Sequence, residues 1–383
     1  MKKIPELLIL FALFVSPLLH NSLENSFQTR RMWSWCLLIS LAIIVFFATY
    51  PFRVQKIFLR LLVPISLILF SSFFLAIYPV NSLALYFLAL ILFLSLAYTI
   101  VTTNNSKNSL IFSVMLVGFC AIYAQWGIAQ FVIQHDLGMS KLGESVLNQN
   151  TAGVASFYVN SEKIIRAYGP FAHANSFAGV LLVGMLVLYK RFNELKNRLF
   201  TQSILFLLSL GIITSFSRTA LFGLVAISIF YMFKKKQTLL IPIVITAIIF
   251  ASLVFQRSVD THGVAVYDRL QGFSWYTNVV DAKVLLRGTG VGNYTNALKQ
   301  YVDASHITYN PWDIAPVHCV PLLLLSELGI IVCTIVIFFL AKYMYTHKLW
   351  MYLVLLPTLA FDHYFVTQLA PVLFLIISTR LVV

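Results

Sequence analysis

Long apolar runs separated by short polar connections recur along nearly the whole chain. A transmembrane α-helix requires about 20 apolar residues, whereas the strands of a membrane β-barrel alternate over about ten residues. The runs here are of the helical kind and predict an all-α, polytopic membrane helix bundle of about twelve transmembrane helices. The predicted spans are 4–20, 33–50, 57–78, 83–102, 110–133, 172–190, 199–217, 219–233, 238–256, 316–341, 348–365 and 369–383.

Two predicted connections are long and divide the chain. The first, residues 134–171, lies within a part made of the first nine predicted helices, residues 1–256. The second, residues 257–315, precedes the last three predicted helices, which occupy residues 316–383. Loops of this length are either functional or disordered. The second loop is rich in aromatic residues suited to packing, so we predict a folded extracytoplasmic loop subdomain. These residues are Trp275, Tyr276, Tyr294, Tyr301, Tyr309 and Trp312.

Composition and charge agree with a membrane location. Of the 383 residues, 60% are hydrophobic and only 10% are charged, whereas soluble domains have about 25% charged residues. A soluble cytosolic enzyme is therefore excluded. The formal net charge is +14, but if the N-terminus is cytoplasmic, most Lys and Arg residues lie on predicted inner connections. This positive-inside bias explains the basic excess without a nucleic-acid partner and predicts that both termini are cytoplasmic.

Ionisable residues inside or at the edge of an apolar run are costly and are therefore candidates for function. The segment from Arg166 through His173 to Asn175 leads from the first long loop into the span at 172–190. Gly169 and Pro170 break the helical pattern within this segment. Arg166 either extends to lipid headgroups or binds an anionic group such as a phosphate at the membrane edge.

Three further arginines lie on predicted outer connections. Arg218 occupies the turn between the spans at 199–217 and 219–233. It either anchors the helical hairpin or binds phosphate oxygens together with the neighbouring Ser and Thr hydroxyls. Arg269 and Arg287 lie in the large loop and are either solvated charges or part of the same anion site. The glycine-rich run after Arg287 fits neither nucleotide-binding pattern, and we expect a tight turn there.

His318 marks the point where the large loop returns to the membrane. A neutral His can accept a proton from an alcohol near physiological pH, although a helix-capping role is the alternative. Glu327 follows about two and a half helical turns later, so we do not pair it with His318 and expect it to tie this span to a neighbour. Asp362, late in the span at 348–365, needs a partner such as an outer arginine. It either forms a structural ion pair or orients a catalytic arginine, and we favour the structural role.

The remaining candidates for metal or cofactor chemistry are weak. Cys36, Cys120, Cys319 and Cys333 include no CxxC pair, so we expect neither a disulfide framework nor a metal site. No nucleotide, flavin or haem motif is present, and we expect no cofactor. The outer arginines and His318 instead suit a reaction on a phosphate-bearing lipid. In that reaction, arginines hold a diphosphate while His318 deprotonates an attacking hydroxyl.

Four short sequence patterns lie in order on the predicted outer side of the membrane. They are RAYGPFAHANSFAG, SFSRTALFG, DRLQGFSW followed by LLRGTGVGNY, and HCVPLLLLSELGI. With the predicted topology, they resemble the O-antigen ligase and O-antigen polymerase family of bacterial inner-membrane glycosyltransferases, which is related to protein O-oligosaccharyltransferases. The family often has Asn after the His of the last pattern, where this chain has Cys319.

The resemblance implies transfer of a glycan from a polyprenyl-diphosphate carrier to an acceptor hydroxyl, without a metal, on the extracytoplasmic face of the bacterial inner membrane. The acceptor is lipid A-core for a ligase and the growing glycan for a polymerase. By position, Arg166 and Arg218 contact the diphosphate, and Arg269 or Arg287 corresponds to the basic residue of the large loop. His318 is the base or positions the acceptor.

Four other residues complete the predicted site. His173 and Asn175 join the substrate-binding residues, whereas Asp362 and Glu327 support them. A transporter of an anionic lipid or sugar is the alternative from another functional class. It is disfavoured because we find no internal repeat of the kind common in secondary transporters, and because the inner halves of the predicted spans are nearly all apolar.

Overall fold

The computed structural model describes residues 77, 106–140, 144–151, 153–159, 162–191, 194–195, 198–235, 264–309 and 314–382. Of the described residues, 70% are helical, so the predicted helical class is confirmed for this part of the chain. The predicted spans at 4–20, 33–50, 83–102 and 238–256, and that at 57–78 apart from residue 77, lie outside the described residues.

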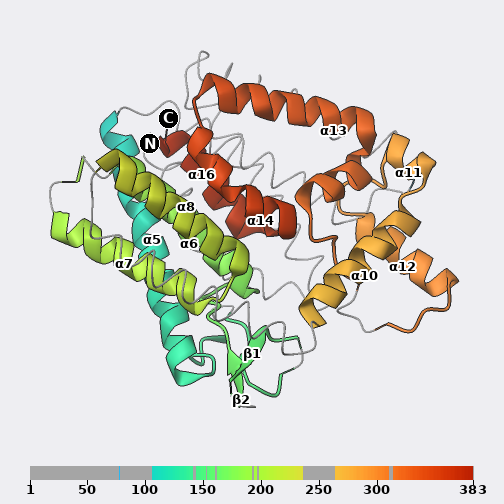
Figure 1. The fold of residues 1–383 in the computed structure, drawn as a ribbon, viewed down its shortest axis with the longest axis horizontal. Coiled ribbons are helices and arrows are strands. Elements are labelled where there is room, and N and C mark those ends of the chain that lie inside the picture. The colour runs from blue at the N-terminus through green and yellow to red at the C-terminus, as the bar shows by residue number, and fades with distance from the viewer. Residues whose placement is uncertain are drawn as a thin grey trace, which may run out of the picture.

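The described helices and strands follow one another in the order shown in Figure 1. They are α5 (Ser106–Ile133), β1 (Ser156–Val159), β2 (Glu162–Ile165), α6 (Ala174–Arg191), α7 (Arg198–Thr214), α8 (Arg218–Lys235), α10 (Val264–Val279), α11 (Ala282–Arg287), α12 (Tyr294–Ala304), α13 (Val320–Thr346), the 3₁₀ helix η5 (Trp350–Leu355), α14 (Leu356–Phe361), α15 (Tyr364–Thr367) and α16 (Leu369–Val382). The two strands pair antiparallel, with Ser156 opposite Ile165.

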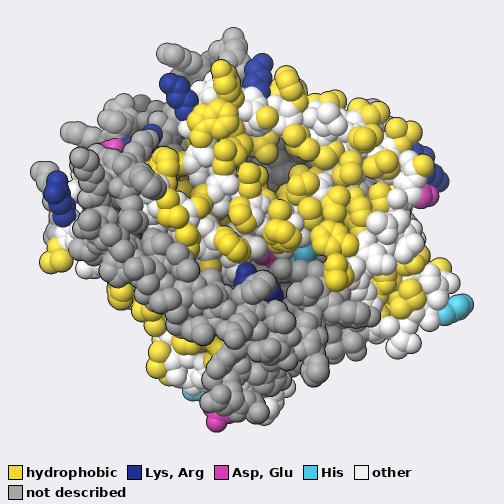
Figure 2. Space-filling model, in the orientation of Figure 1, with side chains coloured by type: hydrophobic (Ala, Val, Ile, Leu, Met, Phe, Trp, Pro, Cys, Tyr) yellow, Lys and Arg dark blue, Asp and Glu magenta, His cyan; other side chains and the backbone are white. Residues whose placement is uncertain are grey.

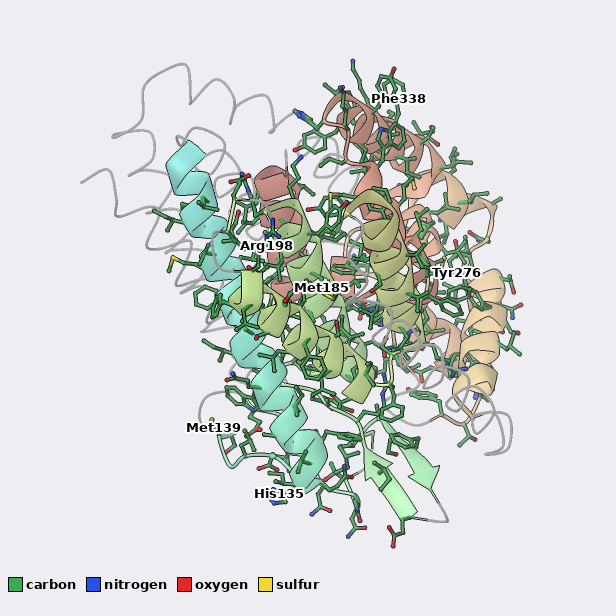
Figure 3. The ribbon with its side chains drawn as sticks, turned by 60° about the vertical axis from the view of Figure 1, so that its left-hand side comes forward. His135, Met139, Met185, Arg198, Tyr276 and Phe338 are labelled. Atoms are coloured by element: carbon green, nitrogen blue, oxygen red, sulfur yellow. The ribbon has the colours of Figure 1, made fainter. Side chains whose placement is uncertain are left out.

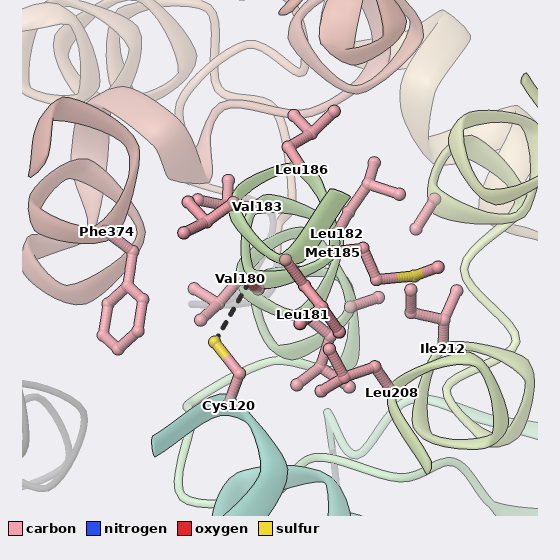
Figure 4. Close-up of a cluster of buried hydrophobic side chains, with 14 of the residues drawn as sticks. Cys120, Val180, Leu181, Leu182, Val183, Met185, Leu186, Leu208, Ile212 and Phe374 are labelled. Atoms are coloured by element: carbon pink, nitrogen blue, oxygen red, sulfur yellow. Dashed lines mark hydrogen bonds between the residues drawn. The ribbon is translucent and has the colours of Figure 1, made fainter. Parts of the chain in front are cut away.

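Helix α6 is the central helix of the bundle and is buried on all sides. Every residue from Ala174 to Tyr189 is buried, and a helix that is apolar all round is stable only where other elements surround it. Helices α5, α7, α8 and α16 pack around it. Figure 4 shows Cys120 of α5, Leu208 of α7 and Phe374 of α16 converging on α6, where the Cys120 thiol lies 3.7 Å from the Val180 carbonyl oxygen.

Two described helices are long and apolar enough to cross a membrane, judged by length and composition. They are Leu110–Ile133 within α5, and α13. Helix α7 and the segments Arg218–Phe230 and Trp350–Phe361 are apolar but shorter. These helices are consistent with membrane association, whereas the full set of twelve spans stays a prediction. The second half of α13 runs across the top of the molecule in Figure 1 at a large angle to α5, so the two helices are not a parallel pair.

The predicted span at 348–365 is not one continuous helix, which corrects that expectation. The 3₁₀ helix η5 passes into α14, which carries Pro357 in its first turn. Proline has no N–H donor, so regular helical hydrogen bonding is interrupted there. The backbone then becomes extended at Asp362 (φ −148°, ψ 156°) before α15 begins. This break turns Asp362 out of the helical path.

The described part of the large loop folds into α10, α11 and α12 around a hydrophobic cluster of its own. Tyr276 of α10 packs there with Tyr294 and Leu298 of α12, and Leu323 of α13 belongs to the same cluster. Burial raises the pKa of Tyr276 to about 12. Its phenol therefore stays protonated and donates a hydrogen bond to the Leu322 carbonyl at 3.2 Å. Figure 3 shows Tyr276 on the opposite side of the molecule from α5.

Helix α13 is interrupted at Gly329, where the glycine-rich run of the large loop packs against it. Gly329 has a φ of 74°, in the left-handed region that favours glycine. A Cβ on Gly329 would lie 2.5 Å from the Leu286 carbonyl oxygen, and a Cβ on Gly288 would clash with the Glu327 carbonyl oxygen. The two backbones approach so closely that both positions require glycine.

Candidate functional site

Asp362 is the centre of a buried polar cluster at the break between α14 and α15. Its side chain is only 4% exposed. Oδ1 accepts a hydrogen bond from Asn175 Nδ2 at 2.9 Å, and Oδ2 accepts one from Thr219 Oγ1 at 3.1 Å. Buried carboxylates persist where such donors compensate for lost water. The two donors lie 187 and 143 residues away in the sequence, so the cluster joins distant parts of the chain.

Arg166 reaches the cluster through Asn175. It directly follows β2, and its Nε donates to the Ser215 carbonyl at 2.5 Å while a terminal nitrogen donates to Asn175 Oδ1 at 2.5 Å. Asn175 therefore accepts from Arg166 with its oxygen and donates to Asp362 with its nitrogen. His173 Nδ1 accepts the Asn175 backbone N–H at 3.1 Å. Hydrogen bonds thus link Arg166, His173 and Asn175, and those made by Arg166 fix the orientation of its guanidinium group.

The turn between α7 and α8 is held in an unusual conformation by aromatic packing. Phe216 has a φ of 50°, a left-handed conformation that is rare for a bulky residue. Its ring centroid lies 4.0 Å from that of Phe157 in β1 and 5.7 Å from that of Phe131 in α5. Strained backbone persists only where the surroundings hold it. These rings therefore set the place at which α8 begins with Arg218.

Arg218 is half-buried at the first position of α8, beside the hydroxyls that were predicted to accompany it. The Thr219 hydroxyl bonds Asp362 and lies 3.3 Å from the Ser217 hydroxyl. Arg218 therefore directly precedes a residue that bonds Asp362, and Arg166 bonds Asn175, the other donor to Asp362. Guanidinium groups suit anionic ligands such as phosphates.

His318 lies just before α13 and beside Asp362. Its Nδ1 is 3.9 Å from Asp362 Oδ1, an ion-pair distance if the imidazole is protonated and longer than a hydrogen bond. The His318 side chain is 39% exposed. The ring centroid of His363 is 5.0 Å from that of His318. His318 therefore combines an accessible imidazole with a buried carboxylate next to it.

The space-filling view shows a small group of charged side chains among hydrophobic ones. Figure 2 has Lys or Arg, Asp or Glu and His side chains close together near the middle of the face, bordered above by hydrophobic side chains. Among the side chains that the structure describes, no three His, Cys, Asp or Glu residues are grouped so that they could hold a metal ion.

Two residues that hold the first long loop on α5 were not predicted. Glu144 is 3% exposed. Its carboxylate accepts hydrogen bonds of 2.7 to 2.9 Å from Trp126 Nε1, Gln130 Nε2, Leu137 N and Met139 N. Gln130 also donates to the Gly169 carbonyl at 3.0 Å and accepts the Tyr168 N–H at 3.2 Å. Both residues thereby fix the segment that carries Arg166. The sequence signal that could have identified this contact is Gln130 itself, a polar residue within the mostly apolar run at 110–133.

Glu327 and Arg287 lie in other surroundings. The Glu327 carboxylate accepts the backbone N–H groups of Gly292 and Tyr294, so it ties α13 to the large loop. Arg287 is exposed at the end of α11. Arg269 lies in α10, and its side chain is outside the described part of the structure.

No protein-family model matches the chain, and comparisons with curated proteins and with solved structures find no match.

Proposed function

We propose that this protein is a bacterial inner-membrane glycosyltransferase of the O-antigen ligase type that acts on the extracytoplasmic face. It transfers a glycan from a polyprenyl-diphosphate carrier to an acceptor hydroxyl, such as one on lipid A-core. The observation that carries the proposal is the cluster in which Asp362 links Asn175, Thr219 and His318, with Arg166 bound through Asn175. An arginine that can bind a diphosphate thus lies near the His318–Asp362 pair, which can accept a proton from a hydroxyl.

Arg166 and Arg218 bind the donor diphosphate. A guanidinium presents a planar fork of donors that matches phosphate oxygens, and it keeps its charge at every physiological pH. Because Arg166 is already bonded to the Ser215 carbonyl and to Asn175, its guanidinium is oriented before the donor arrives. Preorganised donors stabilise the charge that develops on the departing diphosphate at no cost in reorganisation.

His318 accepts the proton of the acceptor hydroxyl. The hydroxyl oxygen attacks the anomeric carbon of the glycan, and the bond from that carbon to the diphosphate breaks with its electron pair going to the diphosphate. Because Nδ1 of His318 faces Asp362, Nε2 receives the proton. The Asp362 carboxylate then stabilises the imidazolium. Attack from the side opposite the leaving group inverts the anomeric configuration.

The surface of α13 supports a membrane setting. Soluble monomers rarely expose large contiguous apolar patches. Beyond its break at Gly329, α13 exposes many large apolar side chains, namely Ile330, Ile331, Ile337, Phe338, Phe339 and Leu340. Contact with acyl chains is the natural role of such a surface.

A transfer assay with purified protein tests the proposal. Protein in detergent receives a polyprenyl-diphosphate oligosaccharide and an acceptor, without nucleotide, and the products are resolved on a gel. We expect Arg218→Ala and His318→Ala each to lower transfer by about 100-fold or more. Arg218→Lys also transfers poorly, because an ammonium lacks the planar fork. The matched control is Arg198→Ala, which removes an exposed arginine at the other end of α7 and retains activity.

The products distinguish the neighbouring functions. Glycan on added lipid A-core indicates a ligase, and a ladder of glycan on the carrier indicates a polymerase. Uptake of labelled substrate into proteoliposomes, with no glycosidic product from any acceptor, indicates a transporter. Wild-type transfer by both folded variants, Arg218→Ala and His318→Ala, would refute the proposed roles of these residues.

A further inference from the structure

The polar cluster is built from two separately packed parts of the chain. On the arginine side, Ala167 and Ala220 are buried with residues of α5 to α8. His318 instead lies between Val317 and Cys319, and both of these pack on the hydrophobic cluster of the large loop. We call the first part the bundle (α5–α8, η5 and α14–α16). We call the second part the loop body (α10–α12 and α13 up to its break).

The break at Gly329 separates the start of α13 from the rest of the helix. Leu323 is buried in the hydrophobic cluster of the loop body, and Tyr276 of α10 donates to the Leu322 carbonyl. Beyond Gly329 the helix changes direction and runs across the top of the molecule (Figure 1). The short piece of α13 that follows His318 is therefore packed as part of the loop body.

Backbone groups of the α11–α12 connection fasten the loop body at this break. The Thr289 N–H donates to the Ser326 carbonyl at 2.8 Å, and the Gly290 N–H donates to the Glu327 carbonyl at 2.9 Å. In an uninterrupted helix these carbonyls would accept N–H groups from the following turn. The connection between α11 and α12 thus supplies hydrogen bonds that the break removes.

The Glu327 side chain completes this attachment from the opposite direction. Its carboxylate accepts the N–H groups of Gly292 and Tyr294, at the start of α12. The first N–H groups of a helix need partners. The N-cap residue Asn293 makes no side-chain capping bond. Glu327 therefore takes the capping role from α13, across the contact between the two segments.

We propose that Glu327 is a positioning residue for His318. By holding the start of α12 on the break in α13, it makes the piece that carries His318 rigid with the loop body. The loop body then sets the distance between His318 and Asp362, across the boundary with the bundle. That distance is 3.9 Å, and a misplacement of about 1 Å at a reacting group can cost about 100-fold in rate. The catalytic consequence rests on the proposed role of His318 as the base.

Two readouts test this proposal on the full-length protein. The first is the rate at which a maleimide alkylates Cys319, measured by peptide mass spectrometry. Cys319 is a partly exposed thiol beside His318, whereas Cys120 and Cys333 are buried. The second is the separation of kcat from the donor KM in the transfer assay, normalised to folded protein. Glu327→Gln keeps the side-chain volume but replaces one acceptor oxygen with a donor.

Glu144→Gln is the matched control, because Glu144 is also a buried carboxylate that accepts backbone N–H groups, but on the bundle side. We expect Glu327→Gln to speed Cys319 alkylation about tenfold, as for the loss of one buried hydrogen bond. It lowers kcat by a similar factor and leaves the donor KM within about twofold, because the arginines stay on the bundle. Glu144→Gln has the converse effect, since it loosens the segment of Arg166. It raises the donor KM and leaves Cys319 alkylation unchanged.

Two results would overturn the proposal. One is a Cys319 alkylation rate that stays at the wild-type value in folded Glu327→Gln protein. The other is that Glu327→Gln and Glu144→Gln change the same kinetic parameter. If Glu327→Gln does not fold, Tyr276→Phe removes a single hydrogen bond of the same attachment and is judged by the same criteria. The Cys319 alkylation rates show whether Glu327 holds the segment of His318 in place, even if the wild-type protein transfers no glycan. A failure of this proposal is therefore distinguishable from a failure of the proposed function.

Discussion

Replacing Asp362 with Asn removes one charge from the centre of the cluster while keeping its shape. The Asn oxygen can still accept the Asn175 amide. Its new NH₂ group can donate to the Thr219 hydroxyl, which then turns towards Ser217, 3.3 Å away. Because a hydroxyl both donates and accepts, the network survives. We therefore expect Asp362→Asn to change the free energy of unfolding by less than about 1 kcal/mol.

The effect on catalysis should be larger, because the charge acts on His318 when the imidazole is protonated. At the 3.9 Å separation of Nδ1 and Oδ1, two unit charges attract by about 4 kcal/mol at an effective dielectric constant of about 20. His318 is 39% exposed, so solvent screening reduces this value to about 2 kcal/mol. A loss of about 2 kcal/mol from the transition state corresponds to a decrease of about 30-fold in kcat.

Steady-state transfer kinetics and thermal unfolding in detergent test both parts of this prediction. The comparison variant is Asp362→Ala, which leaves the Asn175 and Thr219 donors without their acceptor and costs about 1–3 kcal/mol of stability for each buried group. Asp362→Asn should therefore be slow but stable, and Asp362→Ala slow and unstable. A kcat for Asp362→Asn within twofold of the wild-type value would refute the idea that the carboxylate charge assists His318.

Three further substitutions probe other parts of the structure. Gly288→Ala destabilises the protein by at least about 2 kcal/mol in thermal unfolding, because its backbone has a positive φ and the added Cβ would clash with a carbonyl oxygen. The control is Gly272→Ala, where a Cβ on α10 meets open space. It is neutral or stabilising in the same assay. Phe216→Ala costs about 3 kcal/mol or more by thermal unfolding, because its ring packs against two others, and a loss below about 1 kcal/mol would contradict that role. Arg166→Lys raises the donor KM about tenfold, because an ammonium cannot reproduce both hydrogen bonds of the guanidinium; an unchanged KM would remove Arg166 from the donor site.

The helices at the centre of the bundle could be predicted closely from the sequence. The spans at 110–133 and 172–190 correspond to α5 (Ser106–Ile133) and α6 (Ala174–Arg191). Both runs are mostly apolar and flanked by polar residues, so local information is sufficient. The span at 348–365 failed because two interruptions were overlooked: the change from the 3₁₀ helix η5 to α14, which carries Pro357 in its first turn, and the extended backbone at Asp362. The proline is a signal that the sequence itself displays.

Other features depend on contacts between distant segments and could not be predicted. Nothing in the apolar run around Gly329 distinguishes it from a tolerated helical glycine, because the break is stabilised by the backbone of residues 288–290. The same limit applies to the cluster. The sequence identified Arg166 and Asp362 as costly polar residues, but not that Asn175 connects them. Polar side chains in apolar runs indicate which residues need partners, whereas only the fold determines the pairs.

The wide spacing of the cluster along the chain has a consequence for biosynthesis. The ribosome must add the 187 residues that separate Asn175 from Asp362 before the carboxylate can join the arginine side. At typical rates of synthesis this takes about 10 to 40 seconds. During that interval a nascent chain carries Arg166 and Arg218 without the acid that completes the site. Completion of the cluster is therefore a late event in the life of each molecule, and a chain interrupted before Asp362 lacks the buried carboxylate at its centre.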